Sequence, residues 1–248
     1  NGGFSFNPIN LPPAGSGNWV TPLALDPKHP DTLYVGFNSL WKSTNGGASF
    51  NALGTSSISG AGKIDIIAIA PENTNIVCIA DGKNLFKSED YGKTWQALSS
   101  LPGSRAITDI AISALNPENI IVTKSGYLPG EKVFESFDGG GTWQNITAGL
   151  PNVPINCLAI EDNSANGLYI GTDIGIYYRD DIINEWLRFS RQLPNTIVND
   201  LEINFKNRKL RAATYGRGLW QSKLYSDLVR PIAEMRIPQN ACIGETVI

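Results

Sequence analysis

Three aspartates stand where short apolar runs begin, positions from which carboxylates could perform acid–base chemistry. Asp65, Asp109 and Asp200 lie at or next to the start of runs such as "IDIIAIA" and "ITDIAI". Glycoside hydrolysis needs two carboxylates flanking the bond, about 5 to 9 Å apart according to the mechanism. These three residues are the catalytic candidates of the sequence. The simpler interpretation is that they are the polar, hydrated ends of strands.

A further set of carboxylates belongs to a motif that the chain repeats. "KSTNGGASF" is followed by "KSEDYGKTW" and "ESFDGGGTW", and the chain opens on "NGGFSF". A residue needed once for catalysis has no reason to recur, whereas a turn made in every repeat does. Asp, Asn and Ser side chains close turns by accepting backbone N–H groups, and Gly permits positive φ. We therefore predict structural turns formed by Ser43, Asn45, Gly47, Phe50, Ser88, Asp90, Gly92, Trp95, Ser136, Asp138, Gly140 and Trp143.

Other reactive side chains are sparse. His29, the single histidine, lies in the turn "DPKHPD" without a Ser or Cys motif, so a nucleophile–histidine site is not expected. Cys78 and Cys157 sit in apolar runs and are expected to be small buried hydrophobic residues. Together with Cys242 they match no metal-ligand spacing. We expect neither a metal nor a cofactor.

The motif is one part of a longer repeat. Its closing aromatic recurs about every 44 residues, and an apolar triplet such as Ile67-Ala68-Ile69 recurs with the same period. Each repeat holds four short apolar or alternating runs, separated by turns rich in Pro, Asn, Asp and Gly. Four short strands in such a period are typical of one blade of a β-propeller. The closing aromatics are Phe6, Phe50, Trp95, Trp143 and Trp186.

The repeated motif resembles the Asp-box, or BNR repeat, of sialidases, xyloglucanase-like glycosidases, sortilin-type receptors and photosystem assembly factors. The resemblance implies an all-β propeller of four-stranded antiparallel blades, with the box as a structural turn away from the functional face. The fifth copy, "YYRDDIINEW", keeps Asp181 and Trp186. It has Arg179 in place of Ser and Ile183 in place of Gly, so we expect a turn of different shape there.

The repeats divide the chain into two parts. Residues 1–224 hold about five repeats, which we expect to belong to a larger ring of up to seven blades. The alternative is a ring of five blades, closed by pairing the first and last strands. Residues 225–248 lack the blade pattern and resemble a linker and the first strands of a PKD-type, immunoglobulin-like domain. The "MRIP" at 235–238 matches a motif that sialidases carry before their first box, and we interpret its late position as coincidence.

The order of the strands predicts which face of the blades binds ligands. If the strands run from the centre outward, the boxes join third and fourth strands on one face. Ligands are then expected on the opposite face, at the turns between second and third strands. Tyr215 and Arg217 in "YGRG" suit stacking of a sugar and gripping of a carboxylate, or form a structural turn. The candidates on this face are Asp81, Lys83, Tyr127, Asp173, Tyr215 and Arg217.

Composition and resemblance together limit the partners. The net charge of −3 gives no reason to expect nucleic acid, and no run of apolar residues is long enough to insert into a membrane. The resemblance implies a secreted or cell-surface module that binds or scaffolds within a larger, covalently linked multidomain protein, with a polysaccharide or another protein as partner. The alternative is a fragment of a xyloglucanase-like glycoside hydrolase that uses paired aspartates. The absence of matching catalytic motifs favours binding over catalysis.

Overall fold

The computed structural model describes residues 17–53, 62–162, 165–189 and 192–228, which form an all-β protein with one short helix. The strands form five antiparallel sheets, which we call blades 1 to 5. Blade 1 is β1 (Leu23–Leu25), β2 (Leu33–Gly36), β3 (Leu40–Ser43) and β4 (Asn51–Ala52), and blade 2 is β5 (Ile66–Ile69), β6 (Val77–Asp81), β7 (Asn84–Ser88) and β8 (Gln96–Ala97). Blade 3 is β9 (Ile107–Ile112), β10 (Ile120–Lys124), β11 (Val133–Ser136) and β12 (Gln144–Asn145). Blade 4 is β13 (Ile155–Ile160), β14 (Leu168–Thr172), β15 (Gly175–Arg179) and β16 (Leu187–Arg188), and blade 5 is β17 (Val198–Asn204), β18 (Lys209–Thr214) and β19 (Gly218–Lys223).

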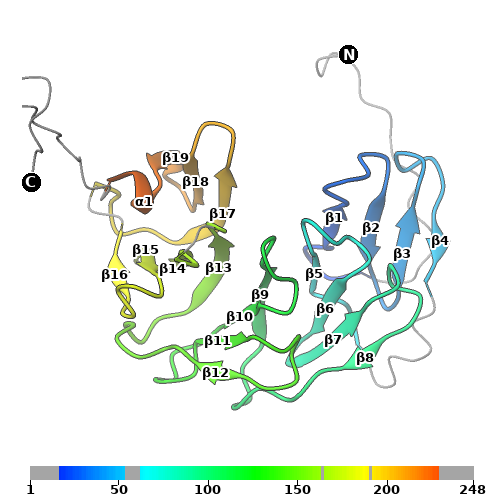
Figure 1. Cartoon of the computed structure of the whole chain (residues 1–248), viewed down its shortest axis with the longest axis horizontal. Coiled ribbons are helices and arrows are strands. Elements are labelled where there is room, and N and C mark those ends of the chain that lie inside the picture. The colour runs from blue at the N-terminus through cyan, green and yellow to red at the C-terminus, as the bar shows by residue number, and fades with distance from the viewer. Residues whose placement is uncertain (1–16, 54–61, 163–164, 190–191, 229–248) are drawn as a thin grey trace, which may run out of the picture.

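In every blade the strands follow chain order from the inside of the molecule outward (Figure 1). The inner strands β1, β5, β9, β13 and β17 lie beside one another, each in contact with the next. Figure 1 shows the blades arranged along an arc that is open between β1 and β17. Four-stranded antiparallel blades around a common centre are the architecture of a β-propeller. The predicted fold is therefore confirmed.

Apolar cores hold neighbouring blades together face to face. Cys78 on one face of blade 2 packs with Ile110 and Val122 of blade 3, and the other blade pairs are joined in the same way. Each fully buried aliphatic side chain of this kind contributes about 1.5 to 3 kcal/mol. The apolar triplet found in the sequence, such as Ile67-Ala68-Ile69, lies in the inner strand of each blade. Its middle residue is small where it packs against the next blade, as at Ala68. In blade 5 the same position holds the exposed Glu202.

The repeated motif forms the turn between the third and fourth strands of blades 1 to 3. In blade 3 the buried Ser136 hydroxyl donates to Asp138 Oδ1 at 2.8 Å and accepts the Gly140 N–H at 2.8 Å. Asp138 accepts both the N–H and the hydroxyl of Thr142, each at 2.8 Å. These bonds, led by the Thr142 N–H, stabilise the charged carboxylate and lower the pKa of Asp138 to about 2. Gly140 has a φ of 93°, and a Cβ there would meet Leu98 of the preceding blade.

The fifth copy of the motif, in blade 4, closes differently, as expected. Asp180 accepts the N–H groups of Ile182 at 3.0 Å and Ile183 at 2.7 Å, and the hydroxyl of Tyr178 at 2.9 Å. Asp181, the residue that aligns with the motif carboxylate, instead accepts a bond from the side chain of Asn166. The turn-closing carboxylate has therefore moved by one residue.

The closing aromatics seat each blade against the one before it. Trp186 is 7% exposed, and its indole Nε1 donates to the Ile146 carbonyl of blade 3 at 2.6 Å. Trp143 makes the equivalent bond to the Ser99 carbonyl at 3.1 Å, but its ring is only partly buried. Trp186 is thus the most deeply seated of these four described aromatics, since Phe50 and Trp95 are also partly exposed.

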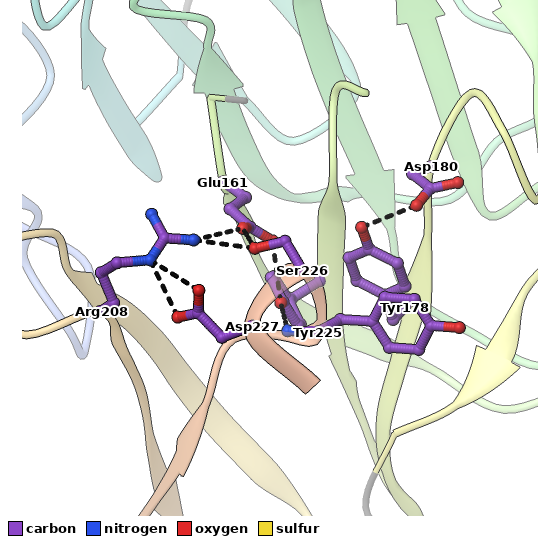
Figure 2. Close-up of polar contacts among 8 residues, drawn as sticks. Glu161, Tyr178, Asp180, Arg208, Tyr225, Ser226 and Asp227 are labelled. Carbon is purple, nitrogen blue, oxygen red and sulfur yellow. Dashed lines mark hydrogen bonds and ion pairs between the residues drawn. The ribbon is translucent and has the colours of Figure 1, made fainter. Parts of the chain in front are cut away.

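After β19 the chain enters α1 (Tyr225–Leu228), a single helical turn that packs on blade 4. Figure 2 shows the Tyr225 ring stacked on Tyr178, with ring centroids 4.2 Å apart, while Ser226 and Arg208 reach the carboxylate of Glu161. The linker predicted from residue 225 therefore begins as a helical turn. The predicted immunoglobulin-like strands, the 235–238 motif and the first repeat copy lie outside the described residues. The described helix is too short to span a membrane.

Candidate functional site

The face opposite the repeated turns carries the hairpins between second and third strands. In blade 2 this hairpin is two residues long, whereas in blade 3 it extends from β10 to β11 over residues 125–132. Two lysines at its ends, Lys124 and Lys132, are each 1% exposed. A buried charge must be satisfied by polar partners. The two buried lysines must therefore have polar partners within or next to the blade 3 hairpin.

The two buried lysines hold the hairpin and its neighbouring loop in place. Lys124 Nζ donates to the carbonyls of Pro102 and Gly103, in the loop that precedes β9. Lys132 Nζ donates to the carbonyl of Gly126 inside the hairpin. Burial lowers the pKa of both lysines, because it penalises the charged form. The backbone carbonyls offset part of that cost and fix both segments relative to each other.

Arg105 lies directly against the same hairpin. A Cβ placed on Gly126 would stand 3.0 Å from Arg105 Cδ, and Gly126 has a φ of 92°, so glycine is required at this point. Arg105 is exposed, and its charge lowers the pKa of Lys132 further. Two cations thus contact the same residue, Gly126: Lys132 binds its carbonyl and Arg105 packs against it.

Tyr127, the next residue, presents its ring to solvent and is 63% exposed. Its hydroxyl donates to Asp173 Oδ2 at 3.3 Å, and Asn156 Nδ2 donates to Asp173 Oδ1 at 3.1 Å. Asp173 belongs to the corresponding hairpin of blade 4. The structure therefore brings two of the predicted binding residues, Tyr127 and Asp173, into one contact between blades.

The other candidates of this face stand apart from that contact. Asp81 accepts the Gly62 N–H beside blade 2, and Lys83 is exposed at the tip of the same hairpin. Tyr215 and Arg217 form the hairpin of blade 5, where Tyr215 is 72% exposed and Arg217 is also exposed. The Arg217 carbonyl accepts the indole N–H of Trp220 at 2.9 Å, which orders the turn.

The three candidate carboxylates divide into a pair and a separate residue. Asp109 and Asp200 occupy equivalent positions on the inner strands of blades 3 and 5, and the charge of Asp200 raises the pKa of Asp109. Burial is the larger cause, and together they raise the pKa of Asp109 to about 7. Asp65 instead accepts the Gly82 N–H at 2.7 Å and a bond from Asn18.

The bonding of Asp109 indicates a structural clamp. Its Oδ2 accepts the Leu158 N–H of blade 4 at 2.8 Å, and its Oδ1 accepts the Ile110 N–H at 2.8 Å. Both oxygens are thus engaged by backbone, with one bond crossing between inner strands. A carboxylate with a pKa near neutrality that is also influenced by a second carboxylate has a property of a catalytic acid.

Replacing Asp109 by asparagine is expected to remove a pH dependence of stability. The pKa rises from about 3.8 in the unfolded chain to about 7 in the folded protein, so the folded state keeps the proton between these values. The contribution of Asp109 to stability is therefore most favourable below pH 4, falls as the pH rises to 7, and is then constant. We expect the free energy of unfolding of Asp109→Asn, relative to that of the native chain, to be higher at pH 8 than at pH 4 by about 1 to 3 kcal/mol. Urea denaturation at both pH values measures this, and a pH-independent difference would contradict it.

A cavity of about 790 Å³ lies between blades 4 and 5. It is lined by apolar side chains including Leu187, Phe189 and Leu193 of the chain around β16, and Trp220 and Tyr225 beyond. The other four blades have a fourth strand in the corresponding place, and the described part of blade 5 does not. The cavity is therefore a consequence of the three-stranded blade.

Sequence reasoning named Tyr127 but missed Arg105, Lys124 and Lys132. Lysines usually lie on the surface, so nothing in "IIVTK" or "GEKVF" marks these two as buried. The available signal was the length of "KSGYLPGEK", which exceeds that of the other hairpins and carries a lysine at each end. Arg105 gave no signal, because its contact with Gly126 joins two loops.

Similar solved structures share this architecture at low sequence identity. The xyloglucanase of family GH74 from Xanthomonas campestris matches with a TM-score of 0.63 and 16% identity, over 81% of this chain and 36% of that one. The extracellular domain of the one component system BT4673 from B. thetaiotaomicron matches with a TM-score of 0.59 and 18% identity, over 78% of this chain and 26% of that one. YCF48 from Cyanidioschyzon merolae matches with a TM-score of 0.55 and 13% identity, over 81% of this chain and 65% of that one.

No protein-family model and no curated protein sequence matches the chain. The chain spans about a third of the length of the xyloglucanase it resembles. At these identities the structural matches establish the fold and leave the ligand to be argued from the site. The chain is a β-propeller module built from four-stranded blades.

Proposed function

We propose that the chain is a binding and scaffold module of a larger multidomain protein that acts outside the cell. Its ligand is a polysaccharide, held on the face opposite the repeated turns. The observation that carries this proposal is the blade 3 hairpin, where the exposed Tyr127 ring is bonded to Asp173 on a loop fixed by Lys124 and Lys132. A surface that is rigid before the ligand arrives loses less entropy on binding. An exposed aromatic ring offers the flat apolar area on which a sugar can stack.

The structural matches and the repeated turns support this proposal. One similar protein is a xyloglucanase and another is an extracellular domain. We also propose that the repeated turns are Asp-boxes, and that a PKD-like domain follows the blades. The residues recur at the spacing of that motif, and every turn lies on the face away from Tyr127.

The two ends of the arc favour a larger ring of up to seven blades. Blade 1 exposes apolar side chains there, with Leu23 at 52% and Leu25 at 59%. Blade 5 exposes Glu202 and Arg211, which are neighbours across β17 and β18, beside Leu219, which is 85% exposed on the same face. Leu23 and Leu25 offer the charged pair no polar partner, so direct closure of five blades is disfavoured.

Tyr127→Ala is the direct test of the binding proposal. We expect it to weaken binding of a polysaccharide series by about tenfold, because a stacked ring contributes about 1 kcal/mol or more and the hairpin contact is lost. Tyr127→Phe keeps the ring and loses only the bond to Asp173, so it should retain most of the affinity. Affinity electrophoresis and calorimetry on purified polysaccharides measure the effect.

Tyr91 provides the matched control on the opposite face. It is an exposed tyrosine in the repeated turn of blade 2, and Tyr91→Ala is expected to leave binding unchanged. Equal losses for the Tyr91 and Tyr127 variants would contradict the proposed face. A chain that binds no polysaccharide at all would overturn the proposed function.

The second candidate function is glycoside hydrolysis, favoured by the coupling of Asp109 and Asp200. In this reaction Asp109 would act as the general acid and Asp200 would be the second carboxylate of the pair. The backbone bonds to both oxygens of Asp109 weigh against it. Release of reducing sugar that disappears in both Asp109→Asn and Asp200→Asn would establish hydrolysis. Release that persists in both would exclude this pair.

A further inference from the structure

The binding face carries positive charge at the same place as its exposed ring. Arg105 is exposed and makes no ion pair with any residue in the described ranges, and the buried Lys132 binds the carbonyl of Gly126, the residue against which Arg105 packs. Two carboxylates lie near this charge, and neither makes an ion pair with Arg105: Glu131 lies against Gly103 and acts on Lys124, and Asp173 acts on Lys132 and is bonded to Tyr127 and Asn156. One guanidinium therefore remains open to an anionic ligand.

From this arrangement we infer that the ligand is an acidic polysaccharide, whose sugar carboxylates bind Arg105 while a sugar ring stacks on Tyr127. This inference rests on the proposed binding function and specifies its ligand class. Guanidinium groups bind carboxylates in a planar, two-pronged geometry, and such charge-assisted bonds are stronger than neutral ones. A uronic acid offers a carboxylate and an apolar ring face within one residue.

The cation at this site is held in position before a ligand arrives. The Arg105 side chain rests against the backbone of Gly126, with Nε 3.1 Å from the place of an absent Cβ. The Ser125 N–H donates to the Ala106 carbonyl at 3.0 Å, which ties the hairpin to the loop bearing Arg105. Together with the Lys124 bonds to the same loop, these contacts fix the distance between cation and ring.

Blade 5 repeats the combination of ring and cation. Tyr215 and Arg217 occupy its hairpin on the same face, both exposed, and Asp173 of blade 4 lies on the intervening hairpin. A second ring-and-cation pair fits a polymer that presents a carboxylate at regular intervals. A neutral polysaccharide would leave both guanidinium groups without an anionic partner.

Polygalacturonate and its methyl-esterified form test the inference, because they share a backbone and differ in charge. We expect the full chain to bind polygalacturonate, and to bind the esterified polymer at least about tenfold more weakly. Arg105→Gln should weaken polygalacturonate binding by about tenfold and leave the esterified polymer unaffected. Binding to polygalacturonate should also weaken as salt rises from 50 to about 200 mM, because the attraction is screened.

Lys93→Gln is the matched control, since Lys93 is an exposed cation in the repeated turn on the opposite face. It removes the same charge and should leave binding unchanged, while thermal melting verifies that both variants fold. One outcome would overturn this inference and leave the proposed function standing. In that outcome the chain binds both polymers equally, Arg105→Gln does not change the binding, and Tyr127→Ala abolishes it. Absence of binding to every polysaccharide would overturn both. Equal binding of polyglutamate would show that charge alone is recognised and would also overturn the inference.

Discussion

Replacing Trp186 by alanine is expected to lower the free energy of unfolding by about 3 to 5 kcal/mol. The Trp186 ring is almost fully enclosed in the core between blades 3 and 4, where it packs with residues such as Ile146 and Tyr177. Its deletion leaves a cavity lined by side chains of both blades, and the Ile146 carbonyl loses its indole donor. Urea denaturation followed by circular dichroism measures the loss, because tryptophan fluorescence would change with the substitution itself.

Trp143 is the matched comparison for Trp186. It holds the equivalent position in blade 3 and bonds the Ser99 carbonyl of blade 2, but its ring is only partly buried. We expect Trp143→Ala to cost about 1 to 3 kcal/mol, since less apolar surface and a smaller cavity are involved. If Trp143→Ala costs as much as Trp186→Ala, the stability that a closing aromatic contributes does not depend on how deeply its ring is buried, and the explanation by burial is wrong.

The sequence was sufficient to predict the blades because their determinants are local and repeated. The closing aromatic and the apolar triplet each mark one position per blade, and both share one period. That period identified the third-to-fourth-strand turns, such as the one around Asp138, and therefore which face they occupy. It also separated the repeated carboxylates from the three at or next to the start of inner strands, of which Asp109 proved the most buried.

The candidate site could be predicted only in part, because its essential contacts join loops from different blades. Tyr127 and Asp173 are 46 residues apart, and their bond depends on how blades 3 and 4 are inclined to each other. Likewise, Arg105 contacts Gly126 only because the fold brings their two loops together. The displacement of the turn carboxylate from Asp181 to Asp180 had a different cause. With Ile183 in place of glycine, the chain could not adopt the usual turn and closed one residue earlier.

The second large effect is expected at Glu161, the buried carboxylate at the end of β13. Its side chain is fully enclosed and accepts the Tyr169 hydroxyl at 3.0 Å, the Ser226 hydroxyl, and the Arg208 guanidinium at 3.4 Å (Figure 2). These bonds connect blade 4 to the first turn of blade 5 and to α1. We expect Glu161→Ala to lower the free energy of unfolding by about 2 to 4 kcal/mol, because buried hydroxyls lose their acceptor and a charged network loses its centre.

The network also predicts where the protein opens first in that variant. The Tyr169 hydroxyl, positioned by Glu161, accepts the Tyr225 N–H at 2.6 Å, so loss of the carboxylate should release α1 before the blades. Hydrogen exchange at Tyr225 should then accelerate more than exchange within β14. Arg208→Ala is the comparison within the same network: Arg208 is 41% exposed and also binds Asp227 and Ser226 of α1, so its removal should loosen α1 but cost less than Glu161→Ala. Equal costs for the two variants, with exchange at Tyr225 unchanged, would show that α1 is held by the stacking of Tyr225 on Tyr178 and that Glu161 contributes little to it.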